Sequence, residues 1–336
     1  MRVRIRGSVA LHILFTVFSL VCFPLPSMAA LPKSSPQGRR TAAVLGATGA
    51  VGQQVVRALL QRGWSNVHLL NRREMGPIQL DNKDNDDALK VASRIHEHIV
   101  PMADGASGGP LEAACGKIFH EHAVDALFIT MGVGAPSKYK GQEGADLLKR
   151  VDVQLPTACA RGARSSSLSV AHVSILTAVG ADVDSVPDTS DRLFGMISRA
   201  RAGGGLYNHC KGRVEQNIRD LGFPSFSTFR PAALLGTPNT PRSVAFICGL
   251  LDPLLPALYK SSKISTLGEA MVLDAEEKLD AVAAVAAGHG ETEAAGAGLP
   301  AKFRFDVFEG GPLHALYART KRGADGTKEN TKKEGL

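Results

Sequence analysis

The sequence has few aromatic residues, no acidic residue before Glu74 and no cysteine pattern typical of a metal site. Aromatic residues make up 5% of the 336 residues. Six of the 39 lysines and arginines lie within residues 1–40, and the remaining 33 face 32 acidic residues. The net charge of +7 therefore comes from the N-terminal segment. A basic nucleic-acid-binding face is not indicated.

The five cysteines are far apart in the sequence, and Cys22 lies in an N-terminal leader. Their spacing matches no zinc motif, so we expect buried free thiols. The sequence also lacks an Asn-x-Ser/Thr signal, which argues against a secreted glycoprotein. Histidines at positions 96, 98, 120 and 122 have spacings that suit surface positions. We expect neither a metal site nor a catalytic role for them.

The N-terminus has the features of a targeting segment. Three arginines within the first six residues precede an apolar run, Val9–Leu25, and small residues at Ser27–Ala29. This pattern predicts a signal segment over residues 1–30, followed by a Pro-, Ser- and Arg-rich linker over 31–40. The interpretations that stay open are a cleaved signal peptide, an uncleaved membrane anchor, and a leader for an organelle such as a plastid or mitochondrion. We expect no stable membrane insertion of the mature domain.

A glycine-rich turn follows the linker. The apolar run Ala42–Leu45 leads into Gly46-x-x-Gly49-x-x-Gly52, and apolar residues at helical spacing come next. Glycines let a backbone turn sharply and approach a pyrophosphate, and the helix N-terminus supplies N–H groups and partial positive charge. The strand–turn–helix context favours dinucleotide binding over an ordinary β–α turn.

The end of the second predicted strand bears on the choice of cofactor. Residues 66–70 are followed by Asn71-Arg72-Arg73, about 20 residues after the glycines, where a dinucleotide fold contacts the adenosine ribose. A carboxylate at this place binds the 2′-hydroxyl of NAD, whereas arginine pairs with a 2′-phosphate. Two arginines and no carboxylate stand here. The sequence predicts NADP(H) rather than NAD(H), although two solvated arginines would give the same pattern.

Further strands and helices alternate along the chain. This alternation predicts a doubly wound parallel α/β sheet of the Rossmann type, with helices on both faces. After Pro231 the pattern becomes irregular and predicts a small C-terminal substrate or lid region, with a strand at 264–267 and a helix start at 270–273. The expected strands are 97–102, 124–131, 168–176, 224–229 and 303–308, and the expected helices are 111–119, 143–163 and 206–221.

A tyrosine and a lysine form the candidate catalytic pair. Tyr207 and Lys211 lie four residues apart, so they share one face of the predicted helix. A nearby ammonium favours the phenolate, and the phenol can then exchange a proton with a carbonyl or alcohol. Thr177, at a strand end, is expected to hold the same substrate oxygen. Tyr259 and Tyr317 are also followed by lysine after three residues, but their positions favour packing roles.

Four motifs, in this order, resemble the atypical short-chain dehydrogenase/reductases, and most closely their Tat-interacting-protein-like group. They are Gly46–Gly52, Thr177–Asp182, Tyr207-x-x-x-Lys211-Gly-x-Val-Glu215 and Phe229–Leu235, and Val151-Asp152 also fits. The resemblance covers about residues 41–275 and implies Tyr207, Lys211 and Thr177 as catalytic residues. The predicted cofactor-binding residues are Gly46, Thr48, Gly49, Ala50, Val51, Gly52, Asn71, Arg72, Arg73, Asp104 at the adenine, Gly132 beside the ribose, Lys211, and Pro231, Ala232 and Ala233 at the nicotinamide.

The sequence departs from this family in two places. Thr177 replaces the usual serine, and the segment between Thr177 and Tyr207 is long. We predict a Rossmann-type domain over 41–318, with substrate regions at 183–205 and 232–300 and a disordered tail at 319–336. Residues 183–205 fit a lid, a protein-partner site or a surface loop.

Two functions stay open at this point. One is an NADP(H)-dependent oxidoreductase that acts on a small carbonyl or alcohol substrate. The other is a non-catalytic NADP(H)-binding regulatory or assembly protein. The Tyr, Lys and Thr set favours the enzyme, and an epimerase is disfavoured because no long nucleotide-sugar domain is evident.

Overall fold

A computed structural model describes eight stretches of the chain: residues 40–75, 92–103, 105–134, 141–166, 170–185, 205–238, 250–286 and 304–320. The leader, nearly all of the linker, Asp104, most of the 183–205 segment and the chain beyond residue 320 lie outside the described residues. The predictions made for them stay predictions.

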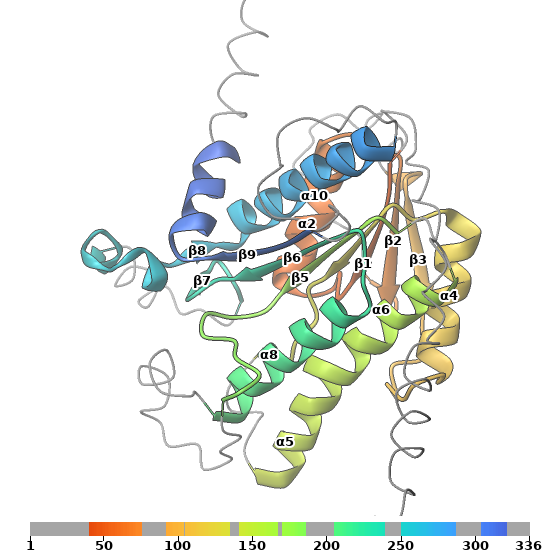
Figure 1. Cartoon of the computed structure of the whole chain (residues 1–336), viewed down its shortest axis with the longest axis horizontal. Helices are drawn as coiled ribbons and strands as arrows, with labels where there is room; N and C mark the ends of the chain where they lie inside the picture. Colours follow the sequence, from red (N-terminus) through yellow and green to blue (C-terminus); the bar gives the residue numbers. More distant parts are fainter. Residues whose placement is uncertain are drawn as a thin grey trace, which may run out of the picture. The chain divides into compact units, whose positions relative to one another are not determined.

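Seven parallel strands form the central sheet, in the order β3-β2-β1-β4-β5-β6-β9 (Figure 1). The first six follow the order of a doubly wound dinucleotide-binding sheet. The predicted fold class is therefore confirmed. The strands are β1 (Thr41–Leu45), β2 (Asn66–Asn71), β3 (Ile95–Ile99), β4 (Ala126–Ile129), β5 (His172–Leu176), β6 (Ser225–Arg230) and β9 (Arg304–Glu309).

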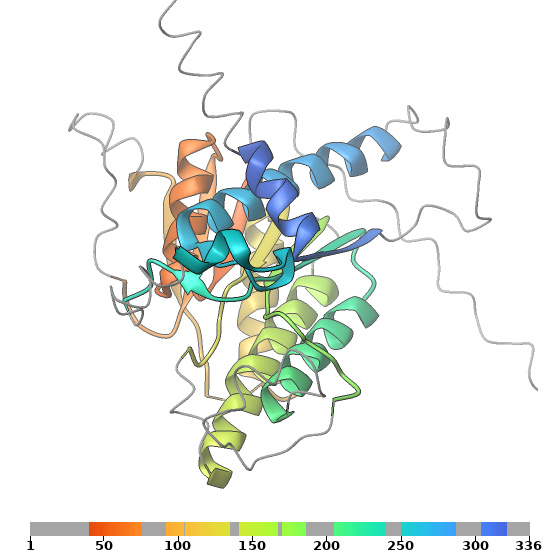
Figure 2. The ribbon, with the colours of Figure 1, turned by 90° about the vertical axis from the view of Figure 1, so that its left-hand side faces the viewer.

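The central strands are buried on both faces, which explains their continuous apolar sequences. In β1, Ala42 and Val44 belong to one hydrophobic cluster, whereas Ala43 and Leu45 belong to another on the opposite face. Helices α2 and α10 cover the first face, and α4, α6 and α8 cover the second (Figures 1 and 2). The helices are α2 (Ala50–Gln61), α4 (Pro110–His122), α5 (Gly141–Lys149), α6 (Leu155–Ser166), α8 (Gly205–Asp220) and α10 (Ile264–Ala286).

One helical stretch changes its hydrogen-bonding pattern in the middle. Between α5 and α6, the π-helical segment η3 (Arg150–Gln154) replaces the α-helical pattern. The sequence predicted a helix over 143–163 without this segment. Such π turns reorient side chains and often occur at functional sites. Here the turn carries the buried Asp152.

The C-terminal part differs from the prediction in two places. The strand expected at 264–267 is wrong, because these residues form the start of α10. Gly268 lies where this helix crosses α2, and a Cβ there would come within 2.8 Å of Gln54. The tail expected from residue 319 is also placed too early, since residues 311–320 are helical. Tyr317 is buried in this helix, in agreement with its predicted packing role.

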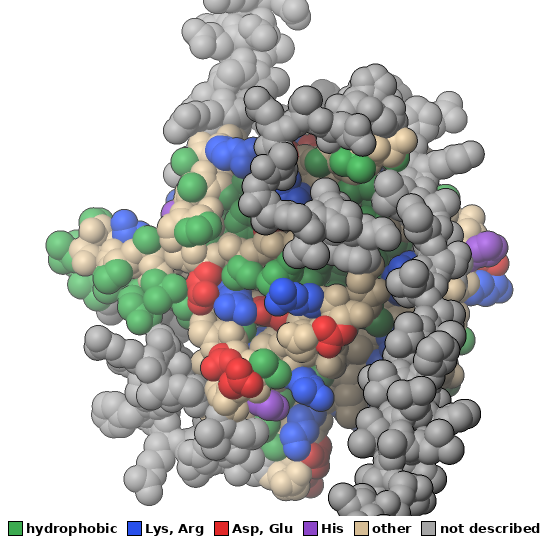
Figure 3. All heavy atoms as spheres, viewed as in Figure 1, with side chains coloured by type: hydrophobic (Ala, Val, Ile, Leu, Met, Phe, Trp, Pro, Cys, Tyr) green, Lys and Arg blue, Asp and Glu red, His purple; other side chains and the backbone are tan. Residues whose placement is uncertain are grey.

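A small two-stranded sheet and two short 3-10 helices precede α10. They are β7 (Leu234–Leu235), β8 (Ser262–Lys263), η4 (Asp252–Leu254) and η5 (Ala257–Tyr259). Leu250, Leu251, Leu254 and Leu255 are exposed there, and Figure 3 shows apolar side chains gathered over this segment. None of the helices in the described stretches is long and apolar enough to span a membrane.

Three cysteines agree with the prediction of buried free thiols. They are Cys115, Cys159 and Cys210.

Candidate functional site

The glycine turn connects β1 to α2, and two of its glycines are required by close backbone contacts. Gly46 has φ +92°, and a Cβ on it would lie 2.8 Å from the Met131 nitrogen. A Cβ on Gly52 would lie 2.2 Å from the Gly46 carbonyl oxygen. No side chain fits at either position, so the turn packs tightly against the end of β4.

The N-terminus of α2 faces this turn without a competing side chain. Gly49 is the N-cap residue, no side chain caps the helix, and its first turn contains no acidic residue. The N-terminus therefore keeps N–H groups and partial positive charge for an anion. Thr48 and Gly49 are exposed, whereas Val51 and Gly52 are buried and position the helix.

The end of β2 carries the three residues predicted to contact the adenosine side. Arg72 and Arg73 are exposed, and in the described part of the chain neither forms an ion pair. Asn71 is buried, and its Nδ2 donates to Glu97 Oε1 at 2.6 Å. The same oxygen accepts a hydrogen bond from the Met75 amide at 2.7 Å. Glu97, which the sequence analysis did not identify, thus shapes the 71–75 segment.

Lys211 and Asp152 form a buried ion pair, with 2.6 Å between Nζ and Oδ1. The other carboxylate oxygen accepts a hydrogen bond from the Val133 amide at 3.0 Å. Burial by itself would lower the pKa of Lys211, but Asp152 and then Tyr207 outweigh it, so the pKa is raised. Lys211 is therefore a fixed cation at neutral pH.

Tyr207 lies one helical turn from Lys211, as predicted. The ammonium is 5.6 Å from the centroid of the Tyr207 ring. The tyrosine is partly buried and packs against a small cluster that includes Val133 and Leu148. The structure thus brings the predicted pair together and adds Asp152 as the partner of the lysine.

Gly132 connects this pair to the glycine turn. A Cβ on Gly132 would lie 3.3 Å from Asp152 Oδ1 and 3.5 Å from Lys211 Nζ. Its neighbour Met131 is the residue that approaches Gly46. The segment that follows β4 therefore connects the glycine turn to Lys211 and Asp152.

Thr177 lies at the end of β5, but its hydroxyl is engaged elsewhere. It donates to Glu215 Oε1 at 2.5 Å, and Glu215 also accepts from Arg230 Nε at 3.0 Å. Arg230 in turn contacts Glu309, whose carboxylate accepts from the Gly180 amide at 2.9 Å. This partly buried network joins the ends of β5, β6 and β9. In this arrangement the Thr177 hydroxyl binds a glutamate instead of pointing to an open substrate position.

Two further parts of the predicted site have structural explanations. Pro231 is buried, Ala232 is half-buried and Ala233 is exposed at the end of β6. The Pro231 carbonyl accepts from the Val179 amide at 3.1 Å, which joins the ends of β5 and β6. Position 212, next to Lys211, requires a glycine because a Cβ there would lie 2.2 Å from the Val183 nitrogen.

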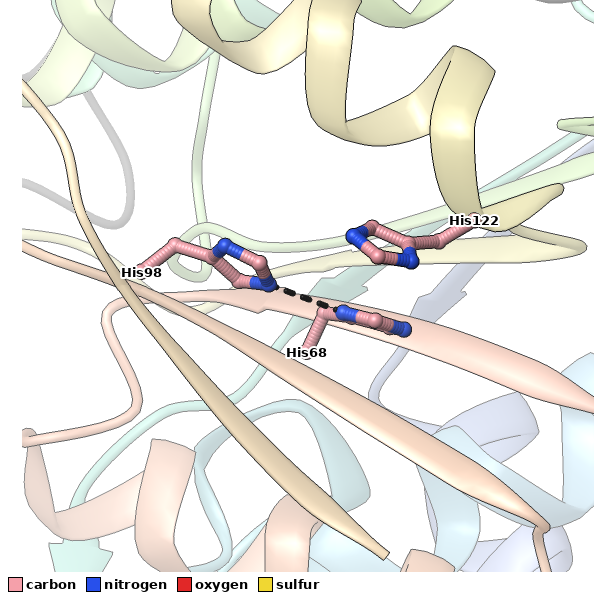
Figure 4. Close-up of side chains that lie close together, drawn as sticks. All are labelled: His68, His98 and His122. Carbon is pink, nitrogen blue, oxygen red and sulfur yellow. Dashed lines mark hydrogen bonds between the residues drawn. The ribbon is translucent and has the colours of Figure 1, made fainter.

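A second group of polar residues lies outside this region. The rings of His68, His98 and His122 are close together, with His68 Nδ1 2.9 Å from His98 Nε2 (Figure 4). Burial, and then the neighbouring histidines, lower the pKa of His68 to about 3. His96 and His98, whose spacing suits surface positions, are half-buried on the edge strand β3, and His96 stacks on His68. His68 was missed because its proximity depends on strand register.

Comparison with known proteins supports the nucleotide-binding part of this description. The model of the NAD dependent epimerase/dehydratase family matches residues 42–192. That range contains the glycine turn, the end of β2 and Asp152, and it ends before Tyr207. The match indicates a nicotinamide-dinucleotide-dependent enzyme of the oxidoreductase or epimerase type. Among curated proteins no sequence matches.

Solved structures to which this chain is similar include dehydrogenases and reductases. The aldohexose dehydrogenase of Thermoplasma acidophilum is 12% identical, with a TM-score of 0.51 over 80% of this chain and 92% of that one. A carbonyl reductase from Pseudomonas aeruginosa PAO1 is 16% identical, with a TM-score of 0.48 over 72% and 93%. The NADPH-dependent 3-quinuclidinone reductase of Rhodotorula rubra is 14% identical, with a TM-score of 0.46 over 84% and 95%. At these identities the similarity concerns the fold alone.

Proposed function

We propose that the protein is an NADP(H)-dependent oxidoreductase of the short-chain dehydrogenase/reductase type, acting on a small carbonyl or alcohol substrate. The observation that carries this proposal is the continuous region from the glycine turn, through Gly132, to Lys211 and Tyr207. A dinucleotide that is anchored at one end of this region reaches a proton donor at the other.

The residues at the glycine turn fit a dinucleotide. The missing side chains at Gly46 and Gly52 let the backbone come close to a diphosphate, and the uncapped N-terminus of α2 complements its charge. In the proposed complex, Gly49 and Ala50 contact the diphosphate, and Gly132 adjoins the ribose next to the nicotinamide. Asp104 is proposed to face the adenine.

The charges at the end of β2 favour NADP(H). Two exposed guanidinium groups suit a 2′-phosphate, and Glu97 is already engaged by Asn71 and Met75. Both hydrogen bonds are accepted by Glu97 Oε1, so they do not prevent Oε2 from accepting another. The negative charge of Glu97 repels a 2′-phosphate, so the proposed preference for NADP(H) depends on the two guanidinium groups.

Tyr207 and Lys211 supply the acid–base chemistry in this proposal. A nicotinamide held here would supply hydride transfer at the carbonyl carbon, and Tyr207 would give a proton to the carbonyl oxygen or take it back. A lysine ammonium has three donors, and Asp152 faces one of them. The others are available to the phenol oxygen and to a cofactor hydroxyl. Asp152 holds Lys211 in place for this task.

The second candidate is a non-catalytic NADP(H)-binding regulatory protein. The position of Thr177 favours it, because the hydroxyl expected to bind the substrate oxygen donates to Glu215. The two candidates share the cofactor site and differ only in turnover.

Mass spectrometry of the nucleotide released from natively purified protein, followed by a screen of carbonyl substrates, separates these candidates. NADP(H) with turnover supports the enzyme. NADP(H) without turnover on any carbonyl supports the regulatory protein. Neither holds if the native protein has no affinity for either nicotinamide dinucleotide.

A further inference from the structure

Three histidines from three separate elements bring their ring nitrogens together. His68 lies on β2, His98 on the edge strand β3, and His122 at the C-terminus of α4. One nitrogen from each ring lies within 4.8 Å of the other two. Figure 4 shows the ring of His122 lying over the ring of His68, with the ring of His98 beside them.

The register of the sheet explains why these side chains meet. In the parallel ladder, His68 is opposite His96 and Leu70 is opposite His98. Paired residues of neighbouring strands point to the same face, and residues two apart on one strand do so as well. Leu70 belongs to the core beneath α4, so this face is the one that α4 covers. The three ligands are therefore positioned by regular secondary structure rather than by loops.

We propose that His68, His98 and His122 form a binding site for one divalent transition-metal ion of the Zn²⁺ class. Imidazole nitrogen is a preferred ligand of Zn²⁺, and three histidines with a water molecule form a known four-coordinate set. A tetrahedral site with ordinary Zn–N bonds has ligand nitrogens about 3.4 Å apart. The nitrogens of His68 and His98 are 2.9 Å apart, and one nitrogen of each ring lies within 4.8 Å of the other two. The rings of His68 and His122 are stacked with centroids 4.3 Å apart, so these rings turn when their nitrogens converge on one ion.

The change in burial across the three residues also suits such a site. His68 is buried, His98 is half-buried and His122 is exposed. The sheet thus holds the metal on its buried side, through His68, and solvent reaches the metal on the side of His122. This open side gives the fourth position to a water molecule.

Metal binding here conserves the charge of the rings. In the metal-free protein, one proton lies between His68 Nδ1 and His98 Nε2, so one ring donates and the other accepts. When both nitrogens bind the metal, that proton moves to the other nitrogen of its own ring. In the metal-bound form the ligating imidazoles are neutral, which is the form that binds metals.

Residues around the cluster hold the ligands in orientation. The ring of His96 stacks on His68 with centroids 4.9 Å apart, and His96 Nε2 is 3.1 Å from Asn66 Oδ1. Glu121 adjoins His122 in sequence, and its carboxylate lies near His98, where it adds negative charge. His96 is in this view a positioning residue and not a ligand.

The proposed metal site is separate from the cofactor site. His68 is three residues before Asn71, so it lies about 10 Å back along β2 from the strand end that carries the two arginines. The metal would join the edge strand β3 to β2 and to the end of α4. Its predicted effect is to stabilise this edge of the sheet, independently of whether the protein turns over a substrate.

Zinc titration of the untagged, full-length protein after removal of metal by a chelator tests this proposal. Calorimetry should give one Zn²⁺ per chain, and Zn²⁺ should raise the temperature of thermal unfolding. Titration with Co²⁺ should give the visible absorption of a four-coordinate nitrogen site. The substitution His122→Ala should weaken Zn²⁺ binding at least about tenfold, since even outer partners of metal ligands have effects of this size.

His120→Ala is the matched control, because His120 is an exposed histidine on the same helix. It should leave Zn²⁺ affinity unchanged. Should His122→Ala fail to fold, His98→Gln serves in its place with the same expected loss. The proposal is overturned if the native protein shows no saturable one-to-one binding, if the ligand variant binds as tightly as the native protein, or if the control loses affinity equally.

Discussion

The ammonium of Lys211 lies 2.6 Å from the carboxylate of Asp152, and both side chains are buried. The pair joins α8, which carries the candidate proton donor Tyr207, to the π-helical turn between α5 and α6. It also adjoins Gly132 at the end of β4. The position of the lysine is therefore set by a residue outside the predicted catalytic set.

Asp152→Asn should destabilise the protein strongly. The substitution leaves the buried Lys211 ammonium without a counter-charge, and breaking a buried pair in this way costs about 3–5 kcal/mol. The pKa of Lys211 should fall for the same reason. Urea unfolding at neutral pH measures the change in the free energy of unfolding.

The matched control for this change is the double variant Asp152→Asn with Lys211→Met. It removes the stranded charge and should recover much of the lost stability, although not the activity. If the single variant is as stable as the native protein, the ion pair does not have the structural role described above.

Gly52→Ala should impair both folding and nucleotide binding. The new Cβ would lie 2.2 Å from the Gly46 carbonyl oxygen, so the turn or the helix must shift. Overpacking of this kind costs about 1–3 kcal/mol. Gly311→Ala is the control, because a Cβ there meets no atom within 4 Å. Equal NADPH affinity in the Gly52 variant and the native protein would contradict the assignment of the turn.

Replacing Arg72 and Arg73 together by alanine should remove the preference for NADPH over NADH. Each charged hydrogen bond to the 2′-phosphate contributes about 1.5–3 kcal/mol, so NADPH affinity should fall by tenfold or more, with little change for NADH. Fluorescence titration with both nucleotides measures this. Lys117→Ala removes an exposed cation on α4 and should affect neither affinity. An unchanged preference in the double variant would mean that the arginines are solvated surface residues.

His172 should make the stability of the protein depend on pH. It is fully buried between the hydroxyls of Ser174 and Ser225, and burial lowers its pKa to about 3. Below pH 6.5, the ordinary pKa of histidine, His172 therefore binds more protons in the unfolded chain than in the folded protein. The contribution of His172 is present above pH 6.5 and falls by about 1.4 kcal/mol per pH unit as the pH decreases toward 3.

Asp274 acts in the opposite direction. Burial raises its pKa from 3.8 to about 6, so its contribution improves as the pH falls from 6 toward 3.8. The native protein loses the stabilising contribution of His172 at lower pH. The stability deficit of His172→Asn, relative to the native protein, should therefore shrink as the pH is lowered from 7 to 5. Asp274→Asn should show the opposite trend: its stability relative to the native protein should decrease over the same pH range. Unfolding curves at several pH values test both, and parallel pH profiles for the three proteins would refute the assignment.

The sequence predicted those features that depend on local pattern. Apolar runs and glycine spacing located the strands and the turn between β1 and α2. The rule that parallel strands end at one edge then placed Arg72, Gly132 and Thr177 near a common site. Tyr207 and Lys211 share a helix face because of their spacing. These predictions do not depend on which helices pack against one another.

Features that depend on tertiary contacts were not predictable in this way. Asp152 is one polar residue within a predicted helix, and its place on a π turn and its contact with Lys211 are seen only in the folded chain. The engagement of Thr177 by Glu215 follows from the packing of α8 on the sheet. The histidine cluster depends on the register between β2 and β3, which spacing within one strand does not reveal.

The most direct test of the proposed function compares the native protein with Tyr207→Phe under saturating NADPH. Both should bind NADPH with similar affinity, since the phenol oxygen is assigned to the substrate and not to the cofactor. With a carbonyl compound from the screen, the native protein should oxidise NADPH, and the variant should be about 10²- to 10⁴-fold slower. Equal rates in the two proteins, or no NADPH binding by the native protein, would contradict the account.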